Sequence, residues 1–556
     1  MIYQPSSSTS NCRLSAGSAS VARRTLKVPR DDRAWLIDPP LEELVAVIER
    51  NAARAESRRG TIAGVEWKAF VAAAREELLA AAVEYTRDFL GDESAARAHR
   101  GPQRMVLAGH QPGLFHPGVW LKNFVLDCAA RQGGATAVNL VIDDDVLRFP
   151  SVLVPGGAPA APTLEPLFFD GPHEHTVWEL RPVADREVFE SFAARAVQRL
   201  SGLIERPLVL DYWPLVVARA SVGCNLGAAL AQARRQWEGS WGVETLEVPQ
   251  SRVCRLATFR RWVAGLLSDL PRFVDAYNQA LADYRRAHRV RNAAQPAPSL
   301  SIEDERHEVP FWLMLGDGRR RRMFARKTAA GIEVADERGV VAIFPPAERD
   351  GGAAAAEELH RLESNGIRVR TRALMTTLWA RLFLGDLFVH GVGGAAYDEV
   401  TDRIIGGYFG VEPPEFAVVS GTLYLPVDVP VGTADQVRLV AQQLRELKYH
   451  PEKAASPPSD SAARQRWEEL TAEKQRVLGG GEPPMSPAAR HRAIESLNRA
   501  LGEFAEAARG ALFDRRETLR RAQRIEGILH RRDVPFLFYP ASTLREFFDG
   551  LLHKME

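Results

Sequence analysis

The sequence has little cysteine, no excess of charge and no long apolar run. Its 4 cysteines show neither a Cys-x-x-Cys pair nor zinc spacing, so we expect no disulfide framework and a reducing, cytoplasmic setting. With 72 basic and 71 acidic residues the net charge is +1, which argues against a global attraction to nucleic acid or to a membrane surface. No run of 18 apolar residues occurs, so we expect no membrane span.

The length and composition are those of a large globular protein. The 556 residues and 46% hydrophobic content predict two to four domains with a sizeable core. The beginning of the chain is Ser-rich and basic and lacks the apolar stretch of a secretory signal. The expected organisation is a disordered tail (1–32), a helical segment (33–104), a core with an inserted hairpin region (105–430), a helical coiled-coil arm (431–532) and an apolar end docking on the core (533–556).

A strand–helix–strand pattern lies between Met105 and Asp145. A short apolar run ends in a Gly/Pro-rich loop, an apolar stretch of helix length follows at Val119–Gln132, and a second run, Ala137–Asp145, ends on three carboxylates. This pattern is typical of α/β proteins with a parallel sheet. Ligands bind such sheets in the crevice beyond the carboxyl ends of the strands.

The loop after the first strand supplies most of the candidate binding residues. A turn flanked by Gly109 and Gly113 lets backbone approach a ligand closely. His110 and His116 could donate hydrogen bonds to a phosphate or an oxyanion, and Lys122 could reach a phosphate from the following helix. The alternative is a set of solvated turn residues and a surface lysine. Gln111 belongs to the same candidate site.

The three carboxylates Asp143–Asp145 end the second strand. Side chains alternate along a strand, so we expect at most two of the three, Asp143 and Asp145, to point into one cleft with His110. They could hold a substrate ammonium or a metal, or one could act as a general base. An ordinary polar strand end is the alternative. We assign catalytic roles to His110, Asp143 and Asp145, and no metal site.

Two further segments are candidates. Val309–Gly316 and Arg319–Ala325 predict a hairpin whose Arg319 and Arg321 could bind phosphate or carboxylate, although a solvated strand face is the more usual outcome and the run is too short for nucleic-acid binding. A glycine-rich loop that opens a helix can hold an anion. That loop contributes His390, Gly391, Gly393, Gly394 and Tyr397, without a Walker motif.

The C-terminal third predicts helices. Ser486-Pro487 favours the start of a long helix, with Ser as N-cap and Pro in the first turn. Its apolar positions alternate steps of three and four, which is typical of a coiled coil, and a turn at Gly479–Gly481 makes an antiparallel hairpin plausible. We expect an arm that could mediate homodimerisation. The seam consists of Ile494, Leu497, Leu501, Phe504, Ala508 and Ala511.

Taken in order, these segments resemble the bacillithiol-biosynthesis cysteine-adding enzyme family. The family strand ending Gly-Gln-Gln-Ala-Gly-Leu is matched by residues 109–114, and its acidic Glu-Asp-His-Asp patch by Asp143–Asp145. Its middle strand with an Arg-rich return is similar to Phe311–Arg322, and its Arg-Pro…Gly-Gly-Pro-Gly-Glu segment to Arg372-Ala373 followed by residues 391–397. The resemblance spans roughly Leu41 to Leu552, including the arm.

The resemblance implies a Rossmann-like, nucleotidyltransferase-like core and the ligation of L-cysteine to the amine of a glucosaminyl malate. Use of ATP is possible by analogy of the core, and the expected partners are small molecules. The chain departs from the family at His110, in the acidic patch, which has no His, and at the missing Pro-Gly-Glu triplet, where Glu399 is only loosely in register. The segment from Gly113 to Lys122 is about two residues shorter. A nucleotidyl- or glycosyl-transferase and a non-catalytic scaffold are the alternatives.

Overall fold

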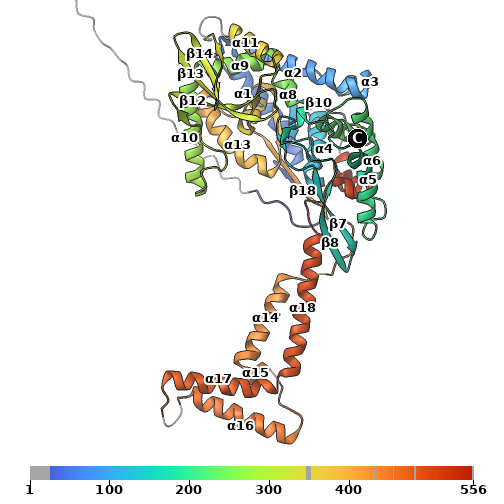
Figure 1. The fold of residues 1–556 in the computed structure, drawn as a ribbon, viewed down its shortest axis with the longest axis vertical. Coiled ribbons are helices and arrows are strands. Elements are labelled where there is room, and N and C mark those ends of the chain that lie inside the picture. The colour runs from blue at the N-terminus through green and yellow to red at the C-terminus, as the bar shows by residue number, and fades with distance from the viewer. Residues whose placement is uncertain (1–25, 346–351, 431, 455, 481–483, 554–556) are drawn as a thin grey trace, which may run out of the picture.

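The computed structural model describes residues 26–345, 352–430, 432–454, 456–480 and 484–553. They form a body of two sheets and many helices, from which a helical arm projects (Figure 1). Among these residues, no helix has the length and apolar character needed to cross a membrane.

A six-stranded, mostly parallel sheet lies at the centre of the body, which confirms the α/β class. Five strands run parallel, and β1 pairs antiparallel with β18 at one edge. In spatial order the strands are β1 (Ala34–Asp38), β18 (Ala417–Thr422), β17 (Leu387–His390), β4 (Met105–His110), β5 (Thr136–Val141) and β10 (Leu246–Pro249).

Helices cover both faces of this sheet because its strands are apolar on both sides. In β4, Met105 and Leu107 join one hydrophobic core, whereas Val106 and Ala108 join the other. The first face packs against α2 (Trp67–Leu90), α8 (Gln250–Val253), α9 (Ala257–Ser268), α10 (Leu270–His288), α12 (Ala373–Trp379) and α13 (Val392–Ile404). The second packs against α1 (Leu44–Ser57), α4 (Pro117–Gln132) and α19 (Ala541–Leu552).

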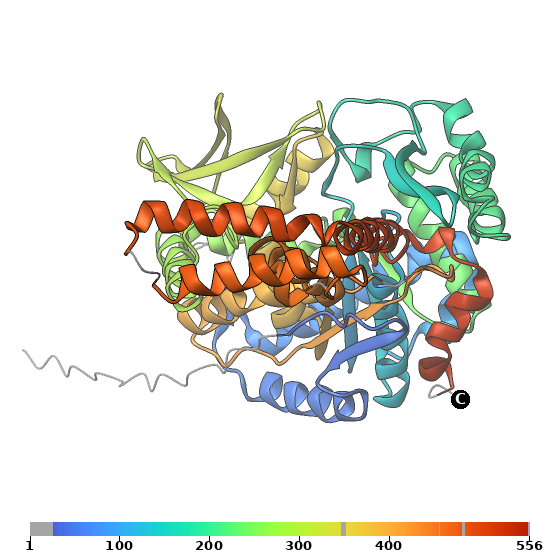
Figure 2. The ribbon, with the colours of Figure 1, turned by 90° about the horizontal axis from the view of Figure 1, so that it is seen from below.

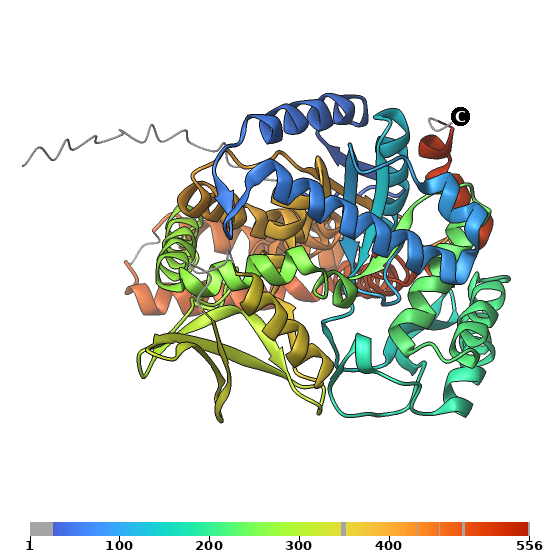
Figure 3. The same ribbon diagram turned by 90° about the horizontal axis from the view of Figure 1, so that it is seen from above.

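Two insertions flank the main sheet (Figures 2 and 3). The first, between β5 and β10, carries the hairpin of β7 (Ser151–Ala158) and β8 (Ala161–Phe168), followed by α5 (Arg186–Leu200), α6 (Val209–Ser221) and α7 (Leu226–Ser240). The second forms an antiparallel sheet. Its strands are β11 (Ile302–Glu303), β12 (Arg306–Met314), β13 (Arg320–Thr328), β14 (Gly331–Asp336), β15 (Gly339–Phe344) and β16 (Arg368–Thr371), with α11 (Ala353–Ser364) before the last. The predicted hairpin is confirmed as β12 and β13.

The arm consists of two pairs of packed helices. Near the body α14 (Ala434–Tyr449) packs on α18 (Glu506–Leu529), and at the far end α16 (Ser461–Leu478) packs on α17 (Pro487–Glu503) across the arm (Figure 1). Ser486 caps α17 as predicted, accepting a hydrogen bond from the Ala489 amide. The prediction of a single long helix is wrong, because the chain bends at Phe504–Ala505 between α17 and α18, where Ala505 is buried. Gly481, in the predicted turn, lies outside the described residues.

Both ends of the described chain pack on the body. Residues 26–32 run along β18, where Thr422 donates a hydrogen bond to the Pro29 carbonyl at 2.6 Å. The predicted tail covers residues 1–32. Its first 25 residues lie outside the described residues, whereas residues 26–32 pack on the body. At the other end, α19 packs on α4, with the rings of Phe124 and Phe548 stacked 4.0 Å apart.

Candidate functional site

The strand order reverses between β4 and β17. From β4 the chain proceeds to β5 and β10 on one side, whereas β17 and β18 lie on the other. The helices that follow β4 and β17, α4 and α13, lie on opposite faces of the sheet. A crevice therefore opens beyond the carboxyl ends of these two strands, which is the place where ligands bind doubly wound sheets.

A cavity of about 480 Å³ occupies this crevice. Eight of the candidate residues line it, from the ends of β4 and β17 and from α4 and α13: Gly109, His110, His116, Lys122, His390, Gly391, Gly393 and Gly394. The rest of the wall comprises Val28, Gly118, Val119, Ile142, Ala373, Thr376, Thr377, Phe388, Val392, Val419, Ser420 and Arg532.

Lys122 is a buried cation in the wall of this cavity. Its side chain is 4% exposed, and Nζ donates one hydrogen bond, of 3.0 Å, to the Gly109 carbonyl. None of the described carboxylates lies within ion-pair distance of it. Burial, together with the charge of Arg234, lowers the pKa of Lys122 to about 8. At neutral pH Lys122 therefore carries a charge without a counter-charge.

Arg532 supplies a second cation from the base of the arm. Its guanidinium donates hydrogen bonds of 2.9 Å to the Ser420 hydroxyl and to the Gly421 carbonyl, which anchors it to β18. Like Lys122, Arg532 forms no ion pair with a described carboxylate. Two cations from opposite ends of the chain thus line one cavity.

His116 and His110 are both neutral, but the Nε2 atom of His116 is a hydrogen-bond donor and the Nε2 atom of His110 is an acceptor. Nδ1 of His116 accepts a hydrogen bond from the Gly118 amide at the start of α4, so the proton lies on Nε2. Nδ1 of His110 lies 2.9 Å from the Gln111 carbonyl and must donate, which leaves Nε2 as an acceptor. Burial lowers the pKa of His110 to about 3, with Lys122 adding to the effect, and that of His116 to about 4.

His390 is the imidazole with a carboxylate partner. Its Nε2 contacts Asp398, which also accepts a hydrogen bond of 3.0 Å from Arg381. Burial opposes the charge of Asp398, but His390 and Arg381 outweigh it and hold the pKa of Asp398 well below its usual range. Nδ1 of His390 faces Gly394, where an added Cβ would lie only 2.9 Å away. A glycine is therefore required beside this ring.

The helix after β17 brings backbone donors to the cavity. No side chain caps α13 at Gly391 among the described residues, so the first amides of the helix, at Val392, Gly393 and Gly394, have no intrahelical acceptor. These three residues line the cavity. Unpaired amides at a helix N-terminus favour an anion.

The electrostatics of the cavity are one-sided. The wall, as far as the described residues form it, contains Lys122 and Arg532 but neither Asp nor Glu. Apolar surface from Ile142, Phe388 and Val419 completes it. This arrangement can bind a small molecule whose anionic group lies at the cations and whose remaining part, apolar or polar, fills the rest of the cavity. No group of three or more metal-ligating side chains occurs within the described parts of the chain.

The acid cluster does not line the cavity, contrary to expectation. Asp143 is buried and accepts hydrogen bonds of 2.8 and 2.5 Å from the amide and hydroxyl of Ser251. Asp145 pairs with Arg320 at 2.9 Å and contacts Gln111. The chain turns directly after β5, so the alternation of a strand does not extend to these residues. His110 and Asp143 therefore do not share one cleft.

The remaining candidates also lie elsewhere. Arg319 pairs with Glu174 at the surface, and Arg321 with Asp317 and Asp336. These carboxylates satisfy both guanidinium groups outside the cavity. The other three are not in the cavity wall either: Gln111, beside Asp145; Gly113, near Trp178; and the exposed Tyr397. Glu399 is bonded to His288 at 2.7 Å.

Sequence reasoning missed Arg532, Thr376 and Ser420. Arg532 is more than 400 positions from Lys122 in the numbering and follows a helix whose pattern suggested only an arm. Thr376 and Ser420 lie in apolar segments that give no periodic signal for a site. The chain matches no model of a known protein family and no curated protein sequence.

Proposed function

We propose that the cavity binds a small dianion, either a dicarboxylate or a phosphate ester. The observation that carries this proposal is the pair of cations Lys122, which is buried, and Arg532, which is half-buried; neither forms an ion pair with a described carboxylate, and the cavity wall contains no described carboxylate. A buried charge without a partner is costly, and a bound anion would offset the cost. The amides of α13 and Nε2–H of His116 would complete the hydrogen bonds.

We further propose that the protein is an amino-acid ligase of the cysteine-adding type, with a Rossmann-like core. The reversal of strand order at the cavity supports such a core. The malate part of glucosaminyl malate carries two carboxylates, which suit Lys122 and Arg532. Its amine would then attack an activated amino-acid carboxylate. ATP is one reagent that could activate it, and its phosphates suit the same donors.

A nucleotidyl- or glycosyl-transferase is the second candidate. The free amides at the start of α13 favour it, because a helix N-terminus suits a phosphate as well as a carboxylate. The substrate would then carry its anion as a phosphate ester.

Calorimetric titration distinguishes these functions. Glucosaminyl malate, L-cysteine and ATP would be titrated singly and together, followed by a nucleotide sugar, and the products analysed by mass spectrometry. The ligase proposal expects binding of glucosaminyl malate and, in the full mixture, formation of the amide. A response to nucleotide sugar alone would favour the transferase. If none of these compounds produces heat on titration, both enzyme proposals are rejected in favour of a non-catalytic scaffold.

A further inference from the structure

The cavity needs a proton acceptor if an amine is to react in it, and two of its three imidazoles, His110 and His116, are poorly suited. His110 is held neutral with a pKa of about 3, so it is a weak base. In His116 the acceptor nitrogen, Nδ1, already accepts a hydrogen bond from the Gly118 amide and is not free to accept a proton from a ligand. Nε2 of His390 faces Asp398, so Nδ1 is the nitrogen of this ring that remains as an acceptor beside Gly394.

A chain of hydroxyl groups leads from the cavity to a buried carboxyl. Thr376, on α12, lines the cavity, and its hydroxyl lies 2.7 Å from the hydroxyl of Thr371 on β16. The Thr371 hydroxyl in turn donates to Asp144 at 3.0 Å. Gln250 donates its side-chain amide to Thr371 at 3.2 Å and fixes that hydroxyl in place. Asp144 itself is 3% exposed.

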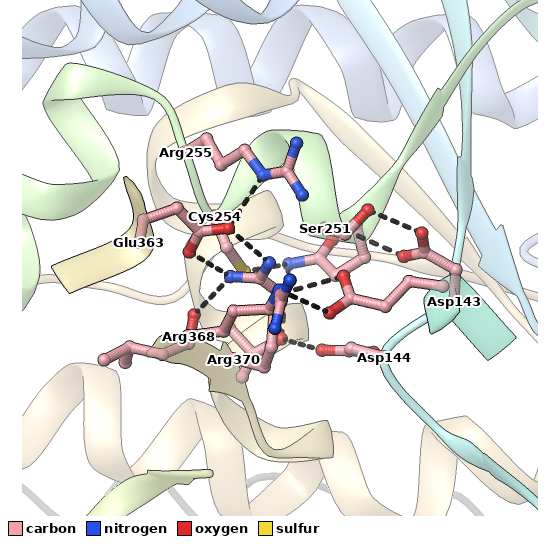
Figure 4. Close-up of polar contacts among 12 residues, drawn as sticks. Asp143, Asp144, Ser251, Cys254, Arg255, Glu363, Arg368 and Arg370 are labelled. Atoms are coloured by element: carbon pink, nitrogen blue, oxygen red, sulfur yellow. Dashed lines mark hydrogen bonds and ion pairs between the residues drawn. The ribbon is translucent and has the colours of Figure 1, made fainter. Parts of the chain in front are cut away.

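The surroundings of Asp144 favour exchange of a proton near neutral pH. Burial and the neighbouring Asp143 raise the pKa of Asp144 to about 7, with Glu179 adding to the effect. Thr371 and the buried Arg370 act in the opposite direction. Arg370 is held by Glu179 at 3.0 Å and by both oxygens of Glu363 at 2.8 Å, so its charge is largely neutralised (Figure 4). The thiol of Cys254 is buried in the same cluster.

We propose that Thr376, Thr371 and Asp144 form a relay that accepts a proton from a ligand in the cavity. This inference rests on the proposed function for the identity of that ligand, an amine. The protonated amine, an ammonium, would donate N–H to Oγ1 of Thr376 while Thr376 passes its own proton to Thr371 and Thr371 passes its proton to Oδ2 of Asp144, which leaves a neutral amine. The nitrogen keeps its electron pair, both hydroxyls are restored, and one carboxylate becomes a carboxylic acid.

The relay also sets the polarity of the cavity wall. When Asp144 is ionised, both hydroxyls point toward it, and Thr376 offers lone pairs to the ligand. When Asp144 is protonated, the direction of donation can reverse, and Thr376 becomes a donor toward the cavity. Thr376 is the residue that touches the ligand, whereas Thr371 and Asp144 act through it and are positioning residues.

Infrared titration of the full-length protein between pH 5 and 9 tests the relay. Wild type should show a carboxylic acid band with a midpoint near pH 7 that Asp144→Asn removes, whereas Asp143→Asn should retain the band at a lower midpoint because the neighbouring negative charge is lost. Thr371→Val should move the midpoint up by about one pH unit, because the ionised carboxyl loses a donor. Thr376→Val should move it up by less, and Thr371→Ser should restore it. Thr518→Val is the matched control, since Thr518 lies on α18 of the arm, away from the cavity, and its hydroxyl donates to the Asp514 carbonyl of the same helix.

A second set of titrations with malate tests the connection to the cavity. Malate should change the wavenumber of the Asp144 band in wild type and in Thr518→Val but not in Thr371→Val. An unchanged midpoint in Thr376→Val, or the absence of a titrating band that Asp144→Asn removes, would overturn the relay. If calorimetry shows that malate does not bind, the anion site fails, and the titrations without malate still decide on the relay.

Discussion

Gly118 and Gly421 pack backbone against backbone where α4 crosses β18. A Cβ built on Gly118 would lie 1.9 Å from the carbonyl oxygen of Gly421, and the same oxygen accepts a hydrogen bond from Arg532. This contact brings the first turn of α4, with Lys122 one turn further on, close to the strand that anchors Arg532. The absence of a side chain at Gly118 thus lets α4, which carries Lys122, lie directly against the strand that anchors Arg532.

We expect Gly118→Ala to lower the free energy of unfolding by about 3 kcal/mol, because the new methyl group meets rigid backbone. Denaturant unfolding measures the change. Gly510→Ala is the control: it lies inside α18 with nothing within 4 Å of an added Cβ. There alanine should stabilise by up to about 1 kcal/mol. Equal effects at the two positions would contradict the close contact.

Lys122→Met should make the ligand-free protein more stable by about 2 kcal/mol at pH 7, since a buried charge without a partner is removed. The pKa of Lys122 is about 8 in the folded protein and near 10.5 when unfolded, so the unfolded state binds more protons between these values. The stability of wild type should therefore rise relative to the variant from pH 8 to 10.5. Urea unfolding of wild type and Lys122→Met across this pH range measures the change in stability, with Lys68→Met, at an exposed lysine, as the control. If Lys122→Met is less stable than wild type at pH 7, Lys122 does not carry an uncompensated charge.

The affinity for malate should fall as the pH rises above 8. Deprotonation of Lys122 removes one of the two cations that hold the anion. Because a bound anion favours the protonated lysine, the midpoint of the decline should lie above that of the free protein. Isothermal titration from pH 7 to 10 measures it, and an affinity that stays constant throughout would exclude Lys122 from the site.

Gly394→Ala should disturb His390, because the new Cβ would lie 2.9 Å from Nδ1. We expect at least a tenfold loss of malate affinity, about 1.4 kcal/mol. Gly406→Ala is the control, since Gly406 lies in the helical turn directly after α13 and outside the cavity wall, and nothing lies within 4 Å of a Cβ built there. Calorimetry of both variants should separate them, and equal losses would mean that the helix backbone rather than His390 is responsible.

The sequence predicted β4, α4 from Val119 onward, β5 and the loop after β4, because apolar runs determine these elements locally; the first turn of α4, which begins at Pro117, was not predicted. It also predicted a glycine-rich loop after the strand β17, but only Gly391 lies between the elements, because α13 already begins at Val392. It failed where orientation depends on a turn, as at Asp143–Asp145, since the two-residue alternation of a strand ends at Val141. It could not identify Arg532, because no periodicity relates the base of the arm to β18. The spacing of three and four residues continues through Phe504, so it did not reveal the bend between α17 and α18.

The central claim is that Lys122 and Arg532 together hold an anion. Its most direct test is isothermal titration of malate into wild type, Lys122→Met, Arg532→Met and the double variant at pH 7, with Lys68→Met as the charge-matched control. The account predicts saturable binding to wild type and the control, at least tenfold weaker binding to each single variant and none to the double variant. Binding of equal strength to wild type and the double variant, or to neither, would contradict it.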